Sequence, residues 1–254
     1  MNDNLTAALV KVPQVTLGFW IIKIAATTLG ETGGDAVTMS MGLGYLEGTL
    51  IFAALFLLVV GVQIRAKRFH PLVYWATIVA TTTVGTTLAD FCDRSLGIGY
   101  AGGSTLLLAL LLISLFVWQR AMGTVAVDTV STPRAELHYW VTIMFSQTLG
   151  TALGDWMAST AGLGFDGAAL VFGALLVGVA ATYFWTSISR TALFWTAFIL
   201  TRPLGATVGD LLDKPHNLGG FGLSRYLASA VLFAFILTAV LLLPQKPARH
   251  GAGH

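Results

Sequence analysis

The fold is decided by a motif first seen in Thr27-Thr28-Leu29-Gly30-Glu31-Thr32-Gly33-Gly34-Asp35, which recurs three more times along the chain. The later copies end in Asp90, Asp155 and Asp210. An aromatic residue followed by Trp lies at the same distance before each Asp, as Phe19-Trp20, Tyr74-Trp75, Tyr139-Trp140 and Phe194-Trp195. Because a repeated frame indicates repeated structural units, we expect four equivalent segments that each place one carboxylate at an equivalent position.

The composition is typical of an integral membrane protein. Of the 254 residues, 56% are hydrophobic and 10% are charged, and the mean hydropathy is +0.78; a soluble domain has roughly 25% charged residues. The single cysteine, Cys92, excludes an intramolecular disulfide and a cysteine-based zinc or iron-sulfur site. The sequence pI of about 8.8 rests on few charges. We therefore expect membrane lipid, and no nucleic acid, as a partner.

We predict eight membrane-spanning helices. A helix needs about 20 apolar residues to cross the bilayer core, and lipid offers backbone groups no hydrogen-bond partner, which favours helices over open strands. The odd-numbered spans carry the motif, and the even-numbered spans are plain apolar runs. The spans are expected near residues 14–38, 46–64, 71–92, 101–119, 137–158, 166–187, 191–212 and 224–243.

The spacing of the four Asp residues groups the copies in pairs. Consecutive Asp residues are 55, 65 and 55 positions apart. This divides the chain into a first half (1–122), a polar linker (123–136) and a second half (137–254). Each repeat holds two spans, so all copies insert in the same direction, around an axis along the membrane normal. The expected fold class is an all-α membrane protein of four parallel two-helix repeats with pseudo-fourfold (2+2) symmetry.

Loop charges predict the orientation. Most Lys and Arg residues in short loops fall on the side that holds both termini, and such loops stay in the cytoplasm. Both termini are therefore expected to be cytoplasmic. The four Trp residues of these pairs would then lie at the cytoplasmic headgroups as an interfacial aromatic belt. Each Asp follows its Trp by fifteen positions, which is about 22 Å along a helix.

The glycines and the charges after the motif have structural interpretations. Small residues four apart, such as Gly30 and Gly34, let membrane helices pack closely. Gly-x-Gly links after the first three copies favour tight turns. The neighbouring charges in Asp93-Arg94 and Asp213-Lys214 are expected to be solvated loop charges.

Each copy places a polar stripe on one helix face, because residues four apart share a face. The stripes contain Lys23, Thr27, Glu31 and Asp35; Thr82, Thr86 and Asp90; Gln147, Thr151 and Asp155; and Arg202 and Asp210. A charge in a membrane helix costs at least ~2.5–3.5 kcal/mol, so each acid must be paired, protonated or bound to a cation. Lys23 and Arg202 balance two of the five acids. The remaining three would hold protons or attract metal.

Two interpretations of the acids remain open. Oxygen ligands suit hard cations such as Mg²⁺, Ca²⁺ or Mn²⁺, which favours a cation site formed by the four Asp residues, with Glu31 as an added acid. Alternatively, the acids cap helix ends or bind loop amides. Lys23 and Arg202 are either counter-charges that bind an acid when the cation leaves or members of plain structural ion pairs.

The full frame resembles a bacterial family of multi-pass inner-membrane proteins that carries a repeat of unknown function. The frame is aromatic-Trp, then Thr-x-x-Gly-x-Thr-x-x-Asp, then Gly-x-Gly-aromatic. Copies three and four depart from it at Gln147, Ala152 and Arg202. The resemblance covers nearly the whole chain and implies a bacterial inner-membrane location, but no activity. Separately, Glu31-Thr32-Gly33-Gly34-Asp35 is similar to the Glu-x-Gly-Asp signature of manganese and calcium cation/proton exchangers, one residue out of register.

We therefore predict transport of a small cation, as export of a divalent metal such as Mn²⁺ by proton exchange. No nucleotide-binding Gly-x-x-x-x-Gly-Lys-Ser/Thr loop occurs in the sequence, and no enzyme activity or resident cofactor is predicted. The expected hydroxyl partners of the acids are Thr28, Thr83 and Thr148, and Thr27, Thr86, Thr151 and Gln147 would line the path. The alternatives are a cation channel and a structural or sensory membrane protein that does not transport. Self-association is left open.

Overall fold

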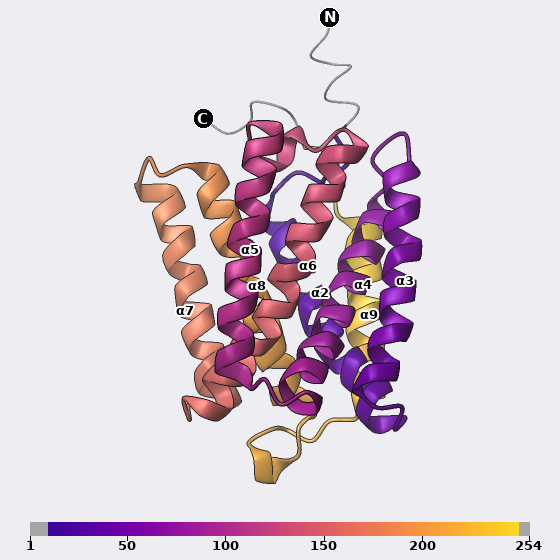
Figure 1. Ribbon diagram of the computed structural model, residues 1–254, viewed down its shortest axis with the longest axis vertical. Helices are drawn as coiled ribbons and strands as arrows, with labels where there is room; N and C mark the ends of the chain where they lie inside the picture. The colour runs from indigo at the N-terminus through magenta and orange to yellow at the C-terminus, as the bar shows by residue number, and fades with distance from the viewer. Residues whose placement is uncertain (1–9, 249–254) are drawn as a thin grey trace, which may run out of the picture.

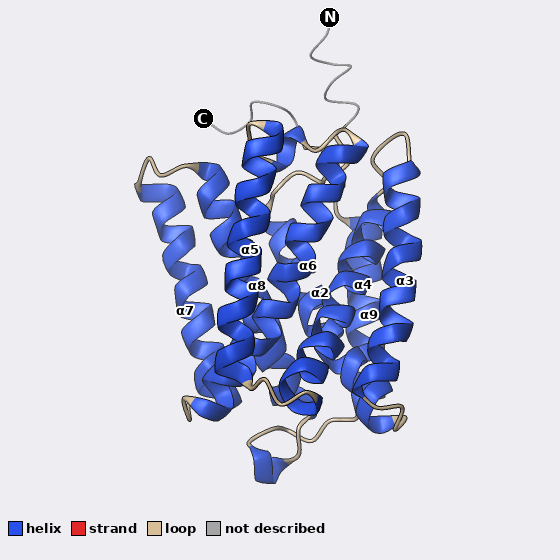
Figure 2. Ribbon diagram, in the orientation of Figure 1, coloured by secondary structure: helices blue, strands red, loops and turns tan. Residues whose placement is uncertain are grey.

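The computed structural model describes residues 10–248, which form helices joined by short loops (Figures 1 and 2). The long helices in this part of the chain correspond to the predicted spans. They are α2 (Leu17–Asp35), α3 (Tyr45–Arg65), α4 (Pro71–Asp90), α5 (Tyr100–Met122), α6 (Pro133–Asp155), α7 (Gly164–Trp185), α8 (Arg190–Asp213) and α9 (Arg225–Leu242). The predicted position of the termini concerns residues 1–9 and 249–254, which lie outside the described range.

Five helices are long and apolar enough to cross a membrane: α3, α4 with its extension to Ser95, α5, α7 and α9. In the most apolar windows of α3, α5, α7 and α9, only 11% to 22% of the residues are buried, against 72% for α4. These four helices therefore lie on the outside of the bundle, and their exposed Leu, Val and Phe side chains suit contact with lipid.

The helices that carry the motif form the inside of the bundle. Helix α2 packs against α4 and α8, and α6 packs against the same two helices, so that the four helices close into a ring. Each plain helix packs outside one of them: α3 on α4, α5 on α6, α7 on α8, and α9 on α2. The outer helices α3 and α7 lie on opposite flanks of the view in Figure 1. Helices from both halves of the chain thus surround one common interior.

Glycine lets neighbouring inner helices touch. A Cβ atom added to Gly205 would lie 2.9 Å from the backbone carbonyl carbon of Thr27, which is closer than real Cβ atoms approach. The same arrangement recurs around the ring, where the glycine of one copy faces the first motif residue of the next. The pairs are Gly30 with Thr82, Gly85 with Gln147, Gly150 with Arg202, and Gly205 with Thr27. These glycines have the packing role that their spacing predicts.

The aromatic-Trp pairs form a second set of contacts around the ring. The first aromatic residue of each pair packs against the Trp of the next copy, with ring centroids 5.4 to 6.2 Å apart. The hydroxyls of Tyr74 and Tyr139 are hydrogen-bonded at 2.6 Å. Because Trp75, Trp140 and Trp195 are buried, the prediction of an interfacial belt is wrong for them. Each of these three Trp rings packs edge to face against the aromatic residue directly before it, as aromatic groups prefer.

The chain leaves three inner helices in the same way. Five-residue π-helical turns follow Asp35, Asp90 and Asp155. The Gly-x-Gly link comes next, and in the first copy Gly42 and Gly44 have φ values of 70° and 84°, which glycine adopts at little cost. In the fourth copy α8 continues to Asp213, and a short 3-10 helix (His216–Leu218) precedes α9. The predicted turns are therefore present after the first three copies.

Because the ring closes through glycine contacts, adding one methyl group at such a glycine should lower the stability of the protein. Gly205→Ala should destabilise the protein by about 1–3 kcal/mol, because the added Cβ must push α8 away from the backbone of α2. Gly178→Ala is a matched control in α7, where no atom lies within 4 Å of the added Cβ. Thermal unfolding in detergent measures both changes. Equal melting temperatures for the two variants would contradict the close approach of α8 and α2.

Candidate functional site

Arg202 connects all four inner helices at the centre of the ring. It is fully buried, and its Nη2 donates hydrogen bonds to Glu31 Oε2 at 3.0 Å and to the hydroxyls of Thr86 and Thr151. Glu31, Thr86 and Thr151 occupy the same motif position in copies one, two and three. One guanidinium group on α8 therefore binds equivalent side chains on α2, α4 and α6.

The four Asp residues lie one helical turn further along and are at most 3% exposed. The sequence predicts that all four meet in one group. Instead, they form two pairs, and a basic side chain of the protein bridges each pair. Arg94 places Nε 2.9 Å from Asp90 Oδ1 and Nη2 3.0 Å from Asp155 Oδ2. Lys214 Nζ pairs with Asp35 and lies 2.8 Å from Asp210 Oδ1. Each cation joins the Asp of its own copy to the Asp of the next.

The prediction that Arg94 and Lys214 are solvated loop charges is wrong for Lys214, which is buried, and incomplete for Arg94, whose side chain is 30% exposed but bridges two buried acids. Each follows its own Asp by four residues, which brings its side chain next to that carboxylate on the same helix face. This spacing is visible in the sequence, but the second carboxylate of each bridge belongs to another helix. The charge balance changes accordingly. Arg94, Arg202 and Lys214 pair with the five acids of the motif, so that two negative charges, and not three, are left over in this group.

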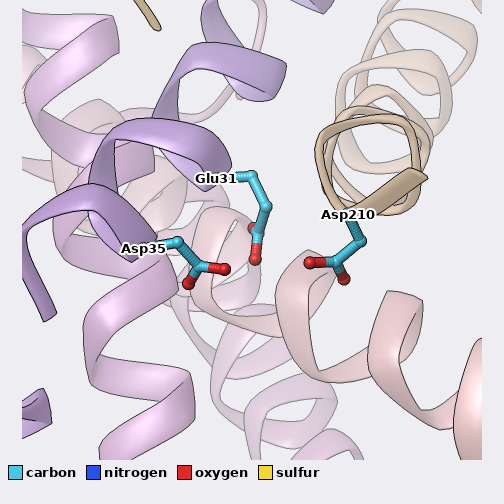
Figure 3. A group of neighbouring side chains, drawn as sticks. All are labelled: Glu31, Asp35 and Asp210. Carbon is cyan, nitrogen blue, oxygen red and sulfur yellow. The ribbon is translucent and has the colours of Figure 1, made fainter. Parts of the chain in front are cut away.

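Three carboxylates converge where copies one and four meet. Oxygen atoms of Glu31, Asp35 and Asp210 all lie within 4.8 Å of one another, and all three residues are buried. Figure 3 shows these side chains directed toward one another, Glu31 and Asp35 from α2 and Asp210 from α8. Oδ1 of Asp35 has no hydrogen-bond partner within residues 10–248. We call this group the carboxylate cluster; its oxygen ligands suit a hard divalent cation. Asp90 and Asp155 are not part of it.

Two further residues border the carboxylate cluster. Arg225, at the start of α9, places Nε 3.3 Å from Asp213 Oδ2 and 3.7 Å from Asp35 Oδ2. Asp213 Oδ1 lies 3.9 Å from Lys214 Nζ. Sequence reasoning missed the role of Arg225, because a basic residue at the end of an apolar span is also typical of an ordinary helix end.

The predicted hydroxyl partners of the acids do not reach them. Thr28, Thr83 and Thr148 each donate a hydrogen bond to the carbonyl four residues earlier in their own helix. Thr27 likewise donates to backbone carbonyls, those of Ile24 and Thr201. A threonine hydroxyl in a helix is readily satisfied in this way. Of the predicted path residues with hydroxyls, only Thr86 and Thr151 therefore contact the charged groups of the motif.

The remaining predicted residues lie on the other side of Arg202 along the inner helices. Lys23 is fully buried, and its Nζ lies 4.1 Å from the centre of the Phe198 ring and 3.4 Å from Thr201 Oγ1. Gln147 is also fully buried, and neither of its side-chain polar atoms has a hydrogen-bond partner within residues 10–248. Within the same residues, no carboxylate lies within 4 Å of Lys23.

The apolar outer helices and the repeated inner motif define a helical transmembrane protein built from an internal repeat. The family model described as Repeat of Unknown Function (DUF347) matches residues 18–69, 73–124, 138–189 and 193–244. These segments cover most of the chain, so the protein belongs to this family, and the resemblance to a four-copy repeat family is confirmed. No curated protein and no solved structure matches the chain.

The network around Arg202 predicts strong coupling with Glu31. Arg202→Met should destabilise the protein by about 3–5 kcal/mol, because it leaves the Glu31 carboxylate as an unpaired buried charge. Adding Glu31→Gln should recover part of the loss, since a neutral amide needs no counter-charge. Thermal unfolding of the two single variants and the double variant measures the coupling. Effects that simply add would contradict the ion pair.

Proposed function

We propose that this protein exports a small divalent cation, Mn²⁺ in the first instance, across the bacterial inner membrane in exchange for protons. The observation that carries the proposal is the carboxylate cluster, three buried acids whose oxygens approach within 4.8 Å inside a bundle with an apolar exterior. The oxygen-only ligand set favours a hard cation. The choice of Mn²⁺ within that class rests on the similarity of Glu31 to Asp35 to the exchanger signature.

The proposed topology has eight transmembrane spans in a pseudo-fourfold (2+2) arrangement with both termini in the cytoplasm. Helices α2, α6 and α8 are less apolar than the five helices suited to a membrane span, but they form one ring with α4. A helix that packs beside a membrane span over its length, with its polar face turned inward, can cross the bilayer despite its charges. The ring thus supports eight spans.

Lys214 supplies the alternating counter-charge in this proposal. Its ammonium bridges Asp35 and Asp210, two of the three acids of the carboxylate cluster. A divalent cation that binds the same oxygens must displace it. Lys214 lies just after the last residue of α8, so its side chain can move away without breaking a helical hydrogen bond within the ring. Metal would leave when Lys214 returns or when the acids take up protons.

Arg202 favours a carrier over a channel. Its guanidinium group reaches across the interior to partners on α2, α4 and α6. A fixed positive charge at that point repels a cation moving along the axis. A continuous cation path would require Arg202 to leave its three partners, whereas exchange at the carboxylate cluster only requires access from one side at a time.

A structural or sensory membrane protein is the second candidate function. The observation that favours it is that all four Asp residues contact a cation of the chain itself. Such a network gives every Asp a cationic partner with no guest ion and would serve to hold the four inner helices together. Transport measurements separate the two candidates.

Reconstituted protein should move Mn²⁺ across vesicle membranes when a pH gradient is imposed. Asp35→Asn and Asp210→Asn should each reduce the rate about tenfold or more, because each removes one anionic ligand, and a loss of 1.4 kcal/mol already corresponds to tenfold. A metal-sensitive dye trapped in proteoliposomes measures the flux.

Asp166→Asn is the matched control for the flux measurement. Asp166 is an exposed carboxylate at the start of α7, outside the carboxylate cluster, and its replacement should leave the rate unchanged. No Mn²⁺ flux in folded wild-type protein, or equal flux in all four proteins, would refute the transport proposal and favour the structural candidate.

Removing the competing lysine should tighten metal binding. Lys214→Gln is expected to increase the affinity for Mn²⁺ about tenfold or more, since the metal no longer displaces an ammonium group. Arg94→Gln is the equivalent change in copy two and lies outside the carboxylate cluster, so the affinity should stay within about threefold. Isothermal titration calorimetry in detergent measures both. Weaker binding in Lys214→Gln would show that Lys214 is not the competitor.

A further inference from the structure

A second buried polar site lies next to Arg202, on the side away from the four Asp residues. Lys23 lies eight residues before Glu31 on α2, which is about 12 Å along the helix. Its ammonium hydrogen-bonds to Thr201, the residue directly before Arg202 on α8. Two cationic side chains on adjacent inner helices therefore enclose one layer of the interior.

This layer holds two basic side chains, Lys23 and Arg202, but only one acid pairs with them. Glu31 is the acid that pairs with Arg202, and it does so from the side of the four Asp residues. The Lys23 ammonium lies over the face of the Phe198 ring and donates one long hydrogen bond to Thr201. It forms no ion pair in the part of the chain that the structure describes. A buried ammonium group without a counter-charge is costly, so that either the amine gives up its proton or a negative group binds beside it.

Several hydrogen-bond donors in the same layer are unused. Within residues 10–248, Arg202 Nε and Nη1, Gln147 Nε2, Thr82 Oγ1 and Ser146 Oγ are buried and have no hydrogen-bond partner. Thr82, Gln147 and Arg202 occupy the same motif position in copies two, three and four, and Ser146 directly precedes Gln147. Donors from three inner helices thus lie at one level. Buried polar groups are normally satisfied, so an unpartnered set calls for a missing water or ion.

A small anion meets both requirements. It accepts hydrogen bonds from N–H and O–H groups and cancels the extra positive charge, whereas a water molecule does only the first and a metal cation is repelled by Lys23 and Arg202. The inner helices touch through Gly30, Gly85 and Gly150 at this level, which favours an ion of atomic size. We propose that the layer between Lys23 and Arg202 binds one small monovalent anion, with chloride as its biological occupant.

The anion site goes beyond the proposed cation transport and would exist equally in a structural protein. Its test is the thermal stability of purified, metal-free protein in detergent, at fixed pH and ionic strength, with sodium gluconate replaced stepwise by sodium chloride. The melting temperature should rise with chloride and reach a plateau, because a ligand that binds only the folded state stabilises it. Bromide should act like chloride, and gluconate is too large to enter.

Two variants make the test specific. Lys23→Met should abolish the chloride response, whereas Lys67→Met, an exposed lysine after α3, should keep it. Gln147→Glu places a carboxylate in the layer, so that the protein should be as stable in gluconate as the wild type is in chloride. This second variant keeps the test decisive if Lys23→Met fails to fold.

Three results would overturn the proposal. The first is a wild-type melting temperature that is the same in chloride and in gluconate, as expected if Lys23 is an uncharged amine. The second is an undiminished chloride response in Lys23→Met. The third is a chloride response of Gln147→Glu equal to that of the wild type, since a carboxylate built into the layer must compete with the anion.

Discussion

The close contact between a glycine of one inner helix and the first motif residue of the next is the constraint on which the rest of the structure depends. Four such contacts, from Gly30, Gly85, Gly150 and Gly205, bring α2, α4, α6 and α8 into a closed ring. Once the helices are this close, residues at the same motif position share one small interior. Arg202 can then reach partners on three other helices, and the aromatic rings of successive copies pack together.

Differences among the copies, more than their likeness, create the candidate site. Copies two and four carry a cation four residues after the Asp, and each cation binds its own Asp and that of the next copy. This turns a fourfold motif into two pairs of acids. Only copy one has a Glu one turn before its Asp. The third carboxylate is therefore present where copy four meets copy one, and the proposed cation site lies there.

Local features were predictable from the sequence, and contacts between copies were not. Long apolar runs and Gly-x-Gly turns depend on neighbouring residues, so the helix positions agree with expectation. Burial of Trp75 and Trp140 and the bridges made by Arg94 and Lys214 depend on which helix lies beside which. The threonines are a third case. The Thr28 hydroxyl donates to the backbone of its own helix, and the sequence pattern alone does not distinguish such a threonine from one that binds a ligand.

The proposed function requires that a divalent cation and Lys214 compete for the carboxylates of Asp35 and Asp210. The most direct measurement is anomalous X-ray scattering at the manganese absorption edge, from crystals grown with Mn²⁺ at high pH. We expect one anomalous peak bounded by oxygens of Glu31, Asp35 and Asp210, with the Lys214 ammonium moved away from both aspartates. No peak at saturating Mn²⁺, with Lys214 still bridging the two carboxylates, would contradict it.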